Sequence, residues 1–123
     1  MLDSGGLIAF DRGDREVAAL VEATRRRRDR IVTASGCVAQ AWRGGGSRQA
    51  LLARLLHGVD ERALDPRASR AVGELCAASN SSDVVDAHVA LLAHAHDIVV
   101  TSDADDLEIL LRAAKSTATA KRC

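Results

Sequence analysis

The sequence predicts an α/β domain with three layers, in which helices flank a mostly parallel central sheet. Short β-branched segments alternate with longer stretches whose apolar residues have helical spacing, an order typical of parallel sheets. One Phe, one Trp and no Tyr leave a core of Leu, Val, Ile and Ala, which favours helices packed on a sheet. The 123 residues, of which 47% are apolar and 28% charged, suit a single globular domain over residues 1–123.

The chain begins with a strand that is almost missing. Only Met1 and Leu2 precede Asp3, whereas a buried strand usually has about 5 residues. Either this strand is very short or the natural start lies upstream. Asp3 is followed by Ser4 and two glycines, which resembles the carboxyl end of a strand turning into a helix, where α/β folds bind their ligands.

The remaining elements follow from periodicity and from cap or turn residues. In the first half we expect helices within 11–30, 37–42 and 47–56 and a strand over 31–33. In the second half we expect a weak strand within 59–64, helices over 66–79, 83–95 and 102–115, and a strand over 98–101. The last strand is a continuous β-branched run, which suits burial on both faces. The tail 116–123 has no pattern and is expected to be frayed or to lie along the surface.

An acidic segment stands out at residues 82–111. It contains no Lys or Arg and seven acidic residues, namely Asp83, Asp86, Asp97, Asp103, Asp105, Asp106 and Glu108. Hard divalent cations are the usual neutraliser of converging carboxylates. The segment therefore predicts a metal site, with Asp97 and Glu108 as surface charges.

Charge is unevenly distributed, although the net charge is zero. Residues 1–62 contain 11 basic and 8 acidic residues, and residues 63–123 contain 6 and 9. A basic region beside an acidic pocket is what an enzyme needs if it acts on a polyanion through metal ions. Three cysteines at unrelated spacings indicate neither a disulfide framework nor a zinc site, which predicts a cytoplasmic protein. We expect no signal peptide and no membrane span.

Three aspartates are expected to meet at one edge of the sheet. Asp3 and Asp103 each follow a strand, and Asp86 lies in the first turn of a helix, on the same face as Asp83. Such carboxylates repel each other unless a cation lies among them, and oxygen ligands suit Mg²⁺ or Mn²⁺. For Asp83 alone, stabilisation of the helix dipole is the slightly favoured explanation.

These residues carry a family resemblance. Three segments, 2–9 (LDSGGLIA), 86–90 (DAHVA) and 100–107 (VTSDADDL), resemble motifs of PIN-domain ribonucleases, and the chain is similar to VapC-type toxins of bacterial toxin–antitoxin pairs. The resemblance implies a metal-dependent endoribonuclease with Asp3, Asp86 and Asp103 as acidic ligands and Asp106 as a further acid. It also implies an RNA substrate, inhibition by a small cognate antitoxin protein, and frequent homodimerisation.

One position departs from the family pattern. Gln40 stands where the family places a glutamate, and glutamine cannot supply charge or act as a base. We hypothesise that Asp83 restores the lost charge. The alternative is a degenerate PIN domain that binds RNA or protein without cleaving; a receiver-like signalling domain is disfavoured because Ser-Asp, and not lysine, follows the last strand. Ser4 and Arg43 are weaker candidates for contacts to the substrate.

Overall fold

The protein has an α/β fold in which all strand pairing is parallel. The structure, a computed structural model, describes residues 1–123. Strand β1 (Val32–Ala34) pairs with β2 (Asp60–Arg62), and β3 (Ile98–Thr101) pairs with β4 (Thr119–Arg122). The predicted α/β class is confirmed. The strands are short and form two small sheets, however, and do not make the clear three-layer arrangement around one central sheet that we expected.

The segment at the start of the chain joins the two sheets. The Leu2 N–H donates to the Val32 carbonyl over 3.0 Å, and the Asp3 N–H donates to the Val100 carbonyl over 3.1 Å. The Thr33 hydroxyl also donates to the Leu2 carbonyl, over 2.7 Å. The expected first strand is thus reduced to a single bridge between Leu2 and Val100. It nevertheless holds Asp3 between the carboxyl ends of β1 and β3.

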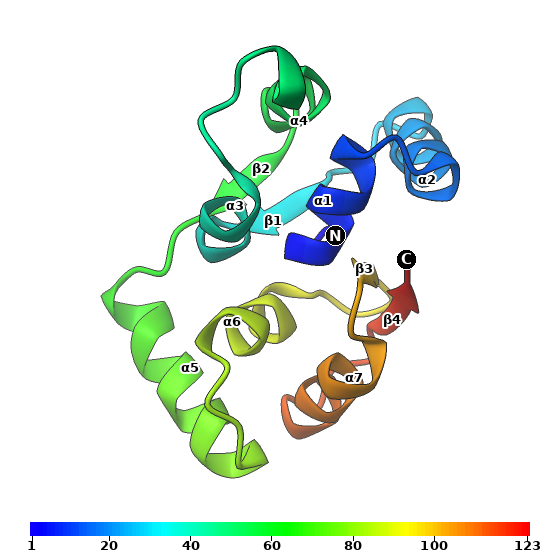
Figure 1. Ribbon diagram of the computed structural model, residues 1–123. Coiled ribbons are helices and arrows are strands. Elements are labelled where there is room, and N and C mark those ends of the chain that lie inside the picture. Colours follow the sequence, from blue (N-terminus) through cyan, green and yellow to red (C-terminus); the bar gives the residue numbers. More distant parts are fainter.

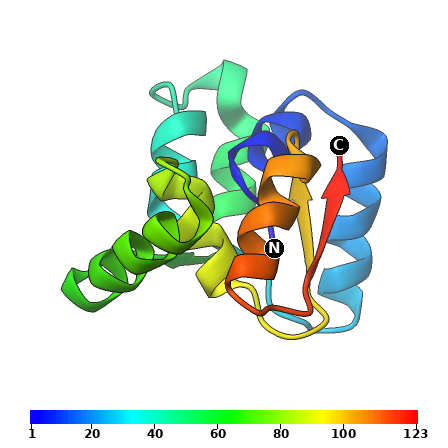
Figure 2. The same ribbon diagram turned by 90° about the horizontal axis from the view of Figure 1, so that it is seen from below.

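Seven α-helices surround these strands (Figures 1 and 2). They are α1 (Ser4–Asp11), α2 (Arg15–Arg26), α3 (Ser35–Ala41), α4 (Ala50–Leu56), α5 (Pro66–Ser79), α6 (Val84–Leu92) and α7 (Ala104–Ala113). The helix expected over 47–56 begins with a 3₁₀ turn, η1 (Ser47–Gln49). Helix α5 shows why several boundaries were predictable: the Asp65 side chain accepts from the Ala68 N–H over 2.7 Å, and Asn80 ends the helix at a φ of 53°.

The tail is not frayed, because residues 119–122 form β4 at the edge of the sheet. Figure 2 shows β4 beside β3. The Thr119 N–H donates to the Asp97 carbonyl and the Cys123 N–H to the Thr101 carbonyl, both over 2.9 Å. Side chains of Lys121 and Arg122 reinforce this pairing through ion pairs with Glu16 and Asp105. The pairing depends on backbone groups of β3 and β4 and not on apolar side chains of the tail. The tail sequence therefore has no apolar pattern that predicts a strand.

The core is one cluster of 20 buried apolar residues that extends from Leu2 to Leu111. Leu7 of α1 and Val99 of β3 have no exposed surface, and Leu107 of α7 has 1%. Burial of these side chains fixes the beginnings of α1 and α7 beside the ends of the strands. No helix has the length and apolar character that crossing a lipid bilayer requires.

Candidate functional site

Asp3 is the most buried acidic side chain of the protein, with 4% of its surface exposed. It caps α1, because its Oδ1 accepts from the Gly6 N–H over 2.8 Å. Burial raises its pKa, and the carboxylate of Asp103 raises it further, while the Thr101 hydroxyl and the amides of Gly6 and Gly5 oppose the rise. A buried carboxylate close to a second one is an uncommon arrangement, and it identifies this edge of the sheet as the candidate site.

Two further predicted site residues also cap helices. The Asp83 Oδ1 accepts from the Asp86 N–H over 2.9 Å at the start of α6, and the Asp103 Oδ1 accepts from the Asp106 N–H over 3.4 Å at the start of α7. Both capping side chains are exposed. Each of the helices α1, α6 and α7 therefore begins at an aspartate. The partial positive charge of a helix N-terminus makes acidic side chains favourable in this position.

Asp86 lies at the centre of the group. Its pKa is raised to about 6, first by burial and then by the charges of Asp83, Asp3, Asp103 and Asp106, in that order. Each of these carboxylates is thus near enough to disfavour the charge on Asp86. We call Asp86 and the four acids that raise its pKa the acidic rim: Asp3, Asp83, Asp86, Asp103 and Asp106.

The acidic rim has no basic partner. The seven ion pairs of the protein involve none of its five residues. Arg122 of β4, the strand beside β3, pairs with Asp105 over 3.0 Å and donates to the Ser102 carbonyl over 3.0 Å. The repulsion around Asp86 is therefore not offset by a side chain of this protein.

The donors of the acidic rim fit a hard divalent cation in their chemistry, because all of them are carboxylate oxygens. Each capping aspartate uses Oδ1 for its helix, and the Oδ2 atoms of Asp83 and Asp103 make no hydrogen bond, whereas the carboxylate of Asp3 also interacts with Gly5 and Thr101. As the side chains stand, no three His, Cys, Asp or Glu residues are gathered closely enough to hold one ion together. Binding by these residues therefore requires side-chain rotation or bridging waters, and Mg²⁺ commonly retains waters.

Two buried residues beside the acidic rim were missed by sequence reasoning. The Thr101 hydroxyl accepts from the Asp103 N–H over 3.0 Å and also interacts with Asp3, so it orients both acids. Cys37 of α3 is fully buried, and its pKa is raised to about 12 by burial and then by the charges of Asp3 and Asp86. Its thiol stays protonated and is not a ligand. Only the position of Thr101 at the end of a β-branched run could have indicated its role.

Two glycines let α1 approach the end of β3. A Cβ on Gly5 would lie 2.5 Å from the Ser102 nitrogen, and a Cβ on Gly6 would lie 2.7 Å from the Val100 carbonyl oxygen. Any side chain at either position would push α1 away from the strand. These glycines therefore hold Asp3 close to Asp103.

Two further residues, Ser4 and Arg43, were predicted to contact the substrate. Ser4 is half-buried at the first position of α1, directly after Asp3. The Arg43 guanidinium donates to the carbonyls of Ala39 and Trp42, over 3.3 and 2.7 Å, so it caps the end of α3. Gln40 is exposed on α3 and its side chain makes no hydrogen bond. The structure therefore does not bring Arg43 to the acidic rim.

Comparison of the chain with models of known protein families, with curated proteins and with solved structures found no match.

Proposed function

We propose that the protein is a metal-dependent endoribonuclease of the PIN type. The observation that carries this proposal is the acidic rim, in which burial and the charges of the four other carboxylates raise the pKa of Asp86 to about 6, with no basic partner for any of the five. Such crowding costs stability and is typical of sites that bind cations or perform acid–base chemistry. The motifs around Asp3, Asp86 and Asp103 and their order in the chain support the same assignment.

In this proposal Asp3, Asp86 and Asp103 hold Mg²⁺ or Mn²⁺, and Asp83 and Asp106 support them. The bound ion supplies an activated water and stabilises the charge that develops on a phosphodiester. Thr101 keeps the carboxylates of Asp3 and Asp103 oriented. Ser4, next to Asp3, is placed to contact the substrate phosphate.

The biological role that we propose is that of the toxin in a toxin–antitoxin pair. Its partners would be an RNA substrate, a small cognate antitoxin protein and a second copy of the chain, and its location would be the cytoplasm. The length of the chain and the order of the three motifs support this part.

The second candidate is a degenerate PIN domain that binds RNA or protein without cleaving it. Two observations favour it: glutamine stands at position 40, and no three potential ligands are gathered closely enough to hold an ion as the side chains stand. Both candidates predict an acidic rim. They differ in whether the metal-loaded protein breaks phosphodiester bonds.

Cleavage of structured RNA by the purified protein separates the two candidates. RNA is incubated with the protein and Mn²⁺ or Mg²⁺, and again with EDTA, and the products are resolved on a denaturing gel. We expect cleavage that requires the metal, is lost in Asp86→Asn and persists in Glu74→Gln. Glu74 is an exposed acid on α5 and is the matched control. Equal cleavage by wild type and Asp86→Asn would point to a contaminating nuclease, and no cleavage under any condition would favour the binding module.

A further inference from the structure

A loop between α3 and α4 presents the only tryptophan of the protein to solvent. This tryptophan loop comprises residues 42–49 and includes the 3₁₀ turn η1 (Figure 1). Trp42 is 38% exposed. Isolated exposed apolar side chains are common on protein surfaces, but this one differs in how it is held and in the charges around it.

A buried glutamine holds the tryptophan loop in place. Gln49 is 8% exposed. Its Oε1 accepts from the N–H groups of Arg43 and Gly45, over 2.7 and 3.1 Å, and its Nε2 donates to the Ala41 carbonyl over 3.0 Å. These bonds satisfy backbone groups on both sides of the turn. A loop ordered in this way loses little conformational entropy when a ligand binds to it.

The backbone of Gly45 packs against the indole ring. A Cβ on Gly45 would lie 2.8 Å from both Cη2 and Cζ2 of Trp42, and the φ of Gly45 is 70°, so both space and conformation require glycine here. A Cβ on Gly44 or Gly46 would meet nothing within 4 Å. The indole is therefore supported by backbone, and the space around the flanking glycines is open.

The segment that carries the tryptophan loop is basic. Residues 31–59 contain Arg43, Arg48, Arg54 and His57 and no Asp or Glu. The three arginines are exposed, and none of them takes part in an ion pair. The Arg43 guanidinium uses only Nη1 for its bonds to the end of α3. The charge of this segment is uncompensated, which favours a polyanion as its ligand.

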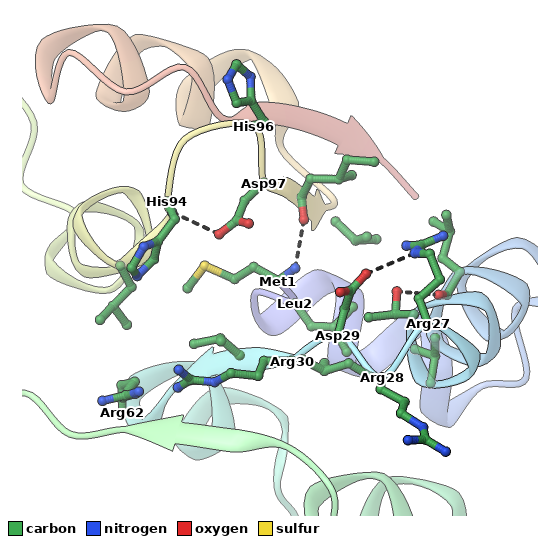
Figure 3. Close-up of a pocket in the computed structure, with 18 of the residues that line it drawn as sticks. Met1, Leu2, Arg27, Arg28, Asp29, Arg30, Arg62, His94, His96 and Asp97 are labelled. Carbon is green, nitrogen blue, oxygen red and sulfur yellow. Dashed lines mark hydrogen bonds and ion pairs between the residues drawn. The ribbon is translucent and has the colours of Figure 1, made fainter.

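The other arginine-rich surface of the protein is partly neutralised (Figure 3). There Arg27 pairs with Asp29, and Arg30 and Arg62 share the carboxylate of Asp60. None of the residues that line the adjacent cavity is aromatic. Only the tryptophan loop combines arginines that have no carboxylate partner with an exposed aromatic ring.

Helix α3 connects the tryptophan loop to the acidic rim. A Cβ on Gly36, in the first turn of α3, would lie 3.0 Å from Cγ2 of Val85, the residue before Asp86 on α6. Because α3 has seven residues, its two ends lie about 10 Å apart. A ligand that runs along α3 from Trp42 therefore reaches the acidic rim after about 10 Å.

We propose that the tryptophan loop binds single-stranded RNA, with one base stacked on the indole of Trp42 and the adjacent phosphates in contact with Arg43 and Arg48. Proteins commonly bind single strands by combining aromatic stacking with basic side chains, and the combination accepts any base. In a duplex the faces of the bases are covered by their neighbours, so a single strand is favoured. The choice of RNA rests on the proposed function, whereas the preference for a single strand rests on the loop itself.

An acidic peptide would also match the charge of the arginines. However, Trp42 and Leu51 are the only large apolar side chains of residues 31–59 that are well exposed. This is little apolar surface for a protein interface, which commonly buries about 800 Å² on each partner. One ring is enough to stack a base, so RNA is favoured.

The fluorescence of Trp42 tests this proposal directly, because the chain contains no other tryptophan. The protein is titrated with single-stranded octauridylate at low ionic strength in EDTA, which prevents metal-dependent cleavage. We expect saturable quenching of the emission. A short RNA duplex should quench it weakly, and inorganic polyphosphate, which has charge but no bases, should not quench it.

Variants measured by the anisotropy of fluorescein-labelled octauridylate localise the binding. Trp42→Ala should weaken binding about tenfold, within the range of one base–aromatic stack, and Trp42→Phe should restore most of it. Arg48→Ala should weaken binding about threefold and reduce the slope of log K against log salt by about 0.7. Arg67→Ala is the matched control, because Arg67 is exposed without an ion pair but lies on α5. Circular dichroism verifies that each variant is folded.

The proposal is overturned by the absence of quenching, by equal binding of Trp42→Ala, by equal quenching by the duplex, or by an equal loss in Arg67→Ala. Emission that changes with protein concentration alone would assign the loop to contact between copies, and tighter binding of oligoaspartate than of octauridylate would assign it to a protein partner.

The outcomes for the loop and for the acidic rim can be told apart. Asp86→Asn should bind octauridylate at least as tightly as wild type, because it removes a negative charge. If RNA binds at Trp42 but is never cleaved, only the ribonuclease proposal fails. If RNA is cleaved with the same KM by wild type and Trp42→Ala, only the proposal for the tryptophan loop fails.

Discussion

Replacing Asp86 by Asn is expected to stabilise the metal-free protein at neutral pH. A pKa raised from 3.8 to about 6 corresponds to about 3 kcal/mol against the ionised form. Because the side chain is only half-buried, solvent screening reduces this cost to about 1.5 kcal/mol. The substitution also removes the favourable interaction between the Asp86 charge and the N-terminus of α6, and this loss offsets roughly 0.5 kcal/mol of the gain. The expected net gain is about 1 kcal/mol in the free energy of unfolding at pH 7.

The sign of the pH dependence follows from the direction of the shift. The pKa of Asp86 is higher in the folded than in the unfolded state, so protonation favours the folded state. This contribution is fully present below pH 3.8 and is lost as the pH rises through about 6. Asn carries no proton to lose, so the advantage of the variant is expected to appear only as the pH rises through that window.

Urea denaturation in EDTA, followed by circular dichroism at pH 4 and pH 7, measures this difference. Glu74→Gln is the control and should match wild type at both pH values. Added Mn²⁺ should reverse the order at pH 7, because an ion that binds only the folded state stabilises wild type more than the variant. If Asp86→Asn is less stable than wild type at pH 7 in EDTA, the crowding of charge around Asp86 does not lower the free energy of unfolding, and the reasoning is refuted.

Three further predictions concern neighbouring positions. Asp83→Asn keeps the helix cap and removes only the charge, so titration calorimetry should show Mn²⁺ binding weakened nearly as much as in Asp86→Asn; unchanged binding would contradict compensation for Gln40. Gly6→Ala should destabilise the fold by about 2 kcal/mol or more in urea denaturation, because its Cβ would overlap β3, whereas Gly73→Ala in the open middle of α5 should stabilise it by about 0.5–1 kcal/mol. Burial lowers the pKa of His88, so the free energy of unfolding of wild type relative to His88→Leu should fall as the pH drops below about 6.5, where the unfolded state takes up the proton; a difference that does not change with pH would exclude this source.

The elements that could be predicted from the sequence are those whose own residues carry a clear strand pattern or helix cap. The run Ile98–Thr101 is β-branched and forms β3, and Asp65 with Pro66 starts α5. Strand β4 and the bridge at Leu2 could not be predicted, because backbone groups of β3 determine both. Leu2 and its partner Val100, for example, lie about a hundred residues apart in the sequence, so no local pattern reports their pairing.

The candidate site was predictable in part for a similar reason. Asp3 and Asp103 follow strands, and the carboxyl ends of parallel strands meet at one edge, so their proximity follows from the fold class. The buried positions of Thr101 and Cys37 depend on packing between α3, α1 and β3, which no local pattern reports. The hydrogen bonds of the Arg43 guanidinium to the carbonyls at the end of its own helix could not be predicted either.

Helix capping and metal binding are compatible roles for the aspartates of the acidic rim. A cap requires one oxygen, and in Asp3, Asp83 and Asp103 that oxygen is Oδ1. Capping alone does not require the three helices to begin near one another, and it leaves the charge on Asp86 without compensation. Asparagine caps a helix about as well as aspartate, so Asn variants keep the helices and remove the charge. If Asp83→Asn and Asp103→Asn keep wild-type stability in EDTA but lose the stabilisation by Mn²⁺, the carboxylates act on the ion; equal responses to Mn²⁺ would leave capping as their whole role.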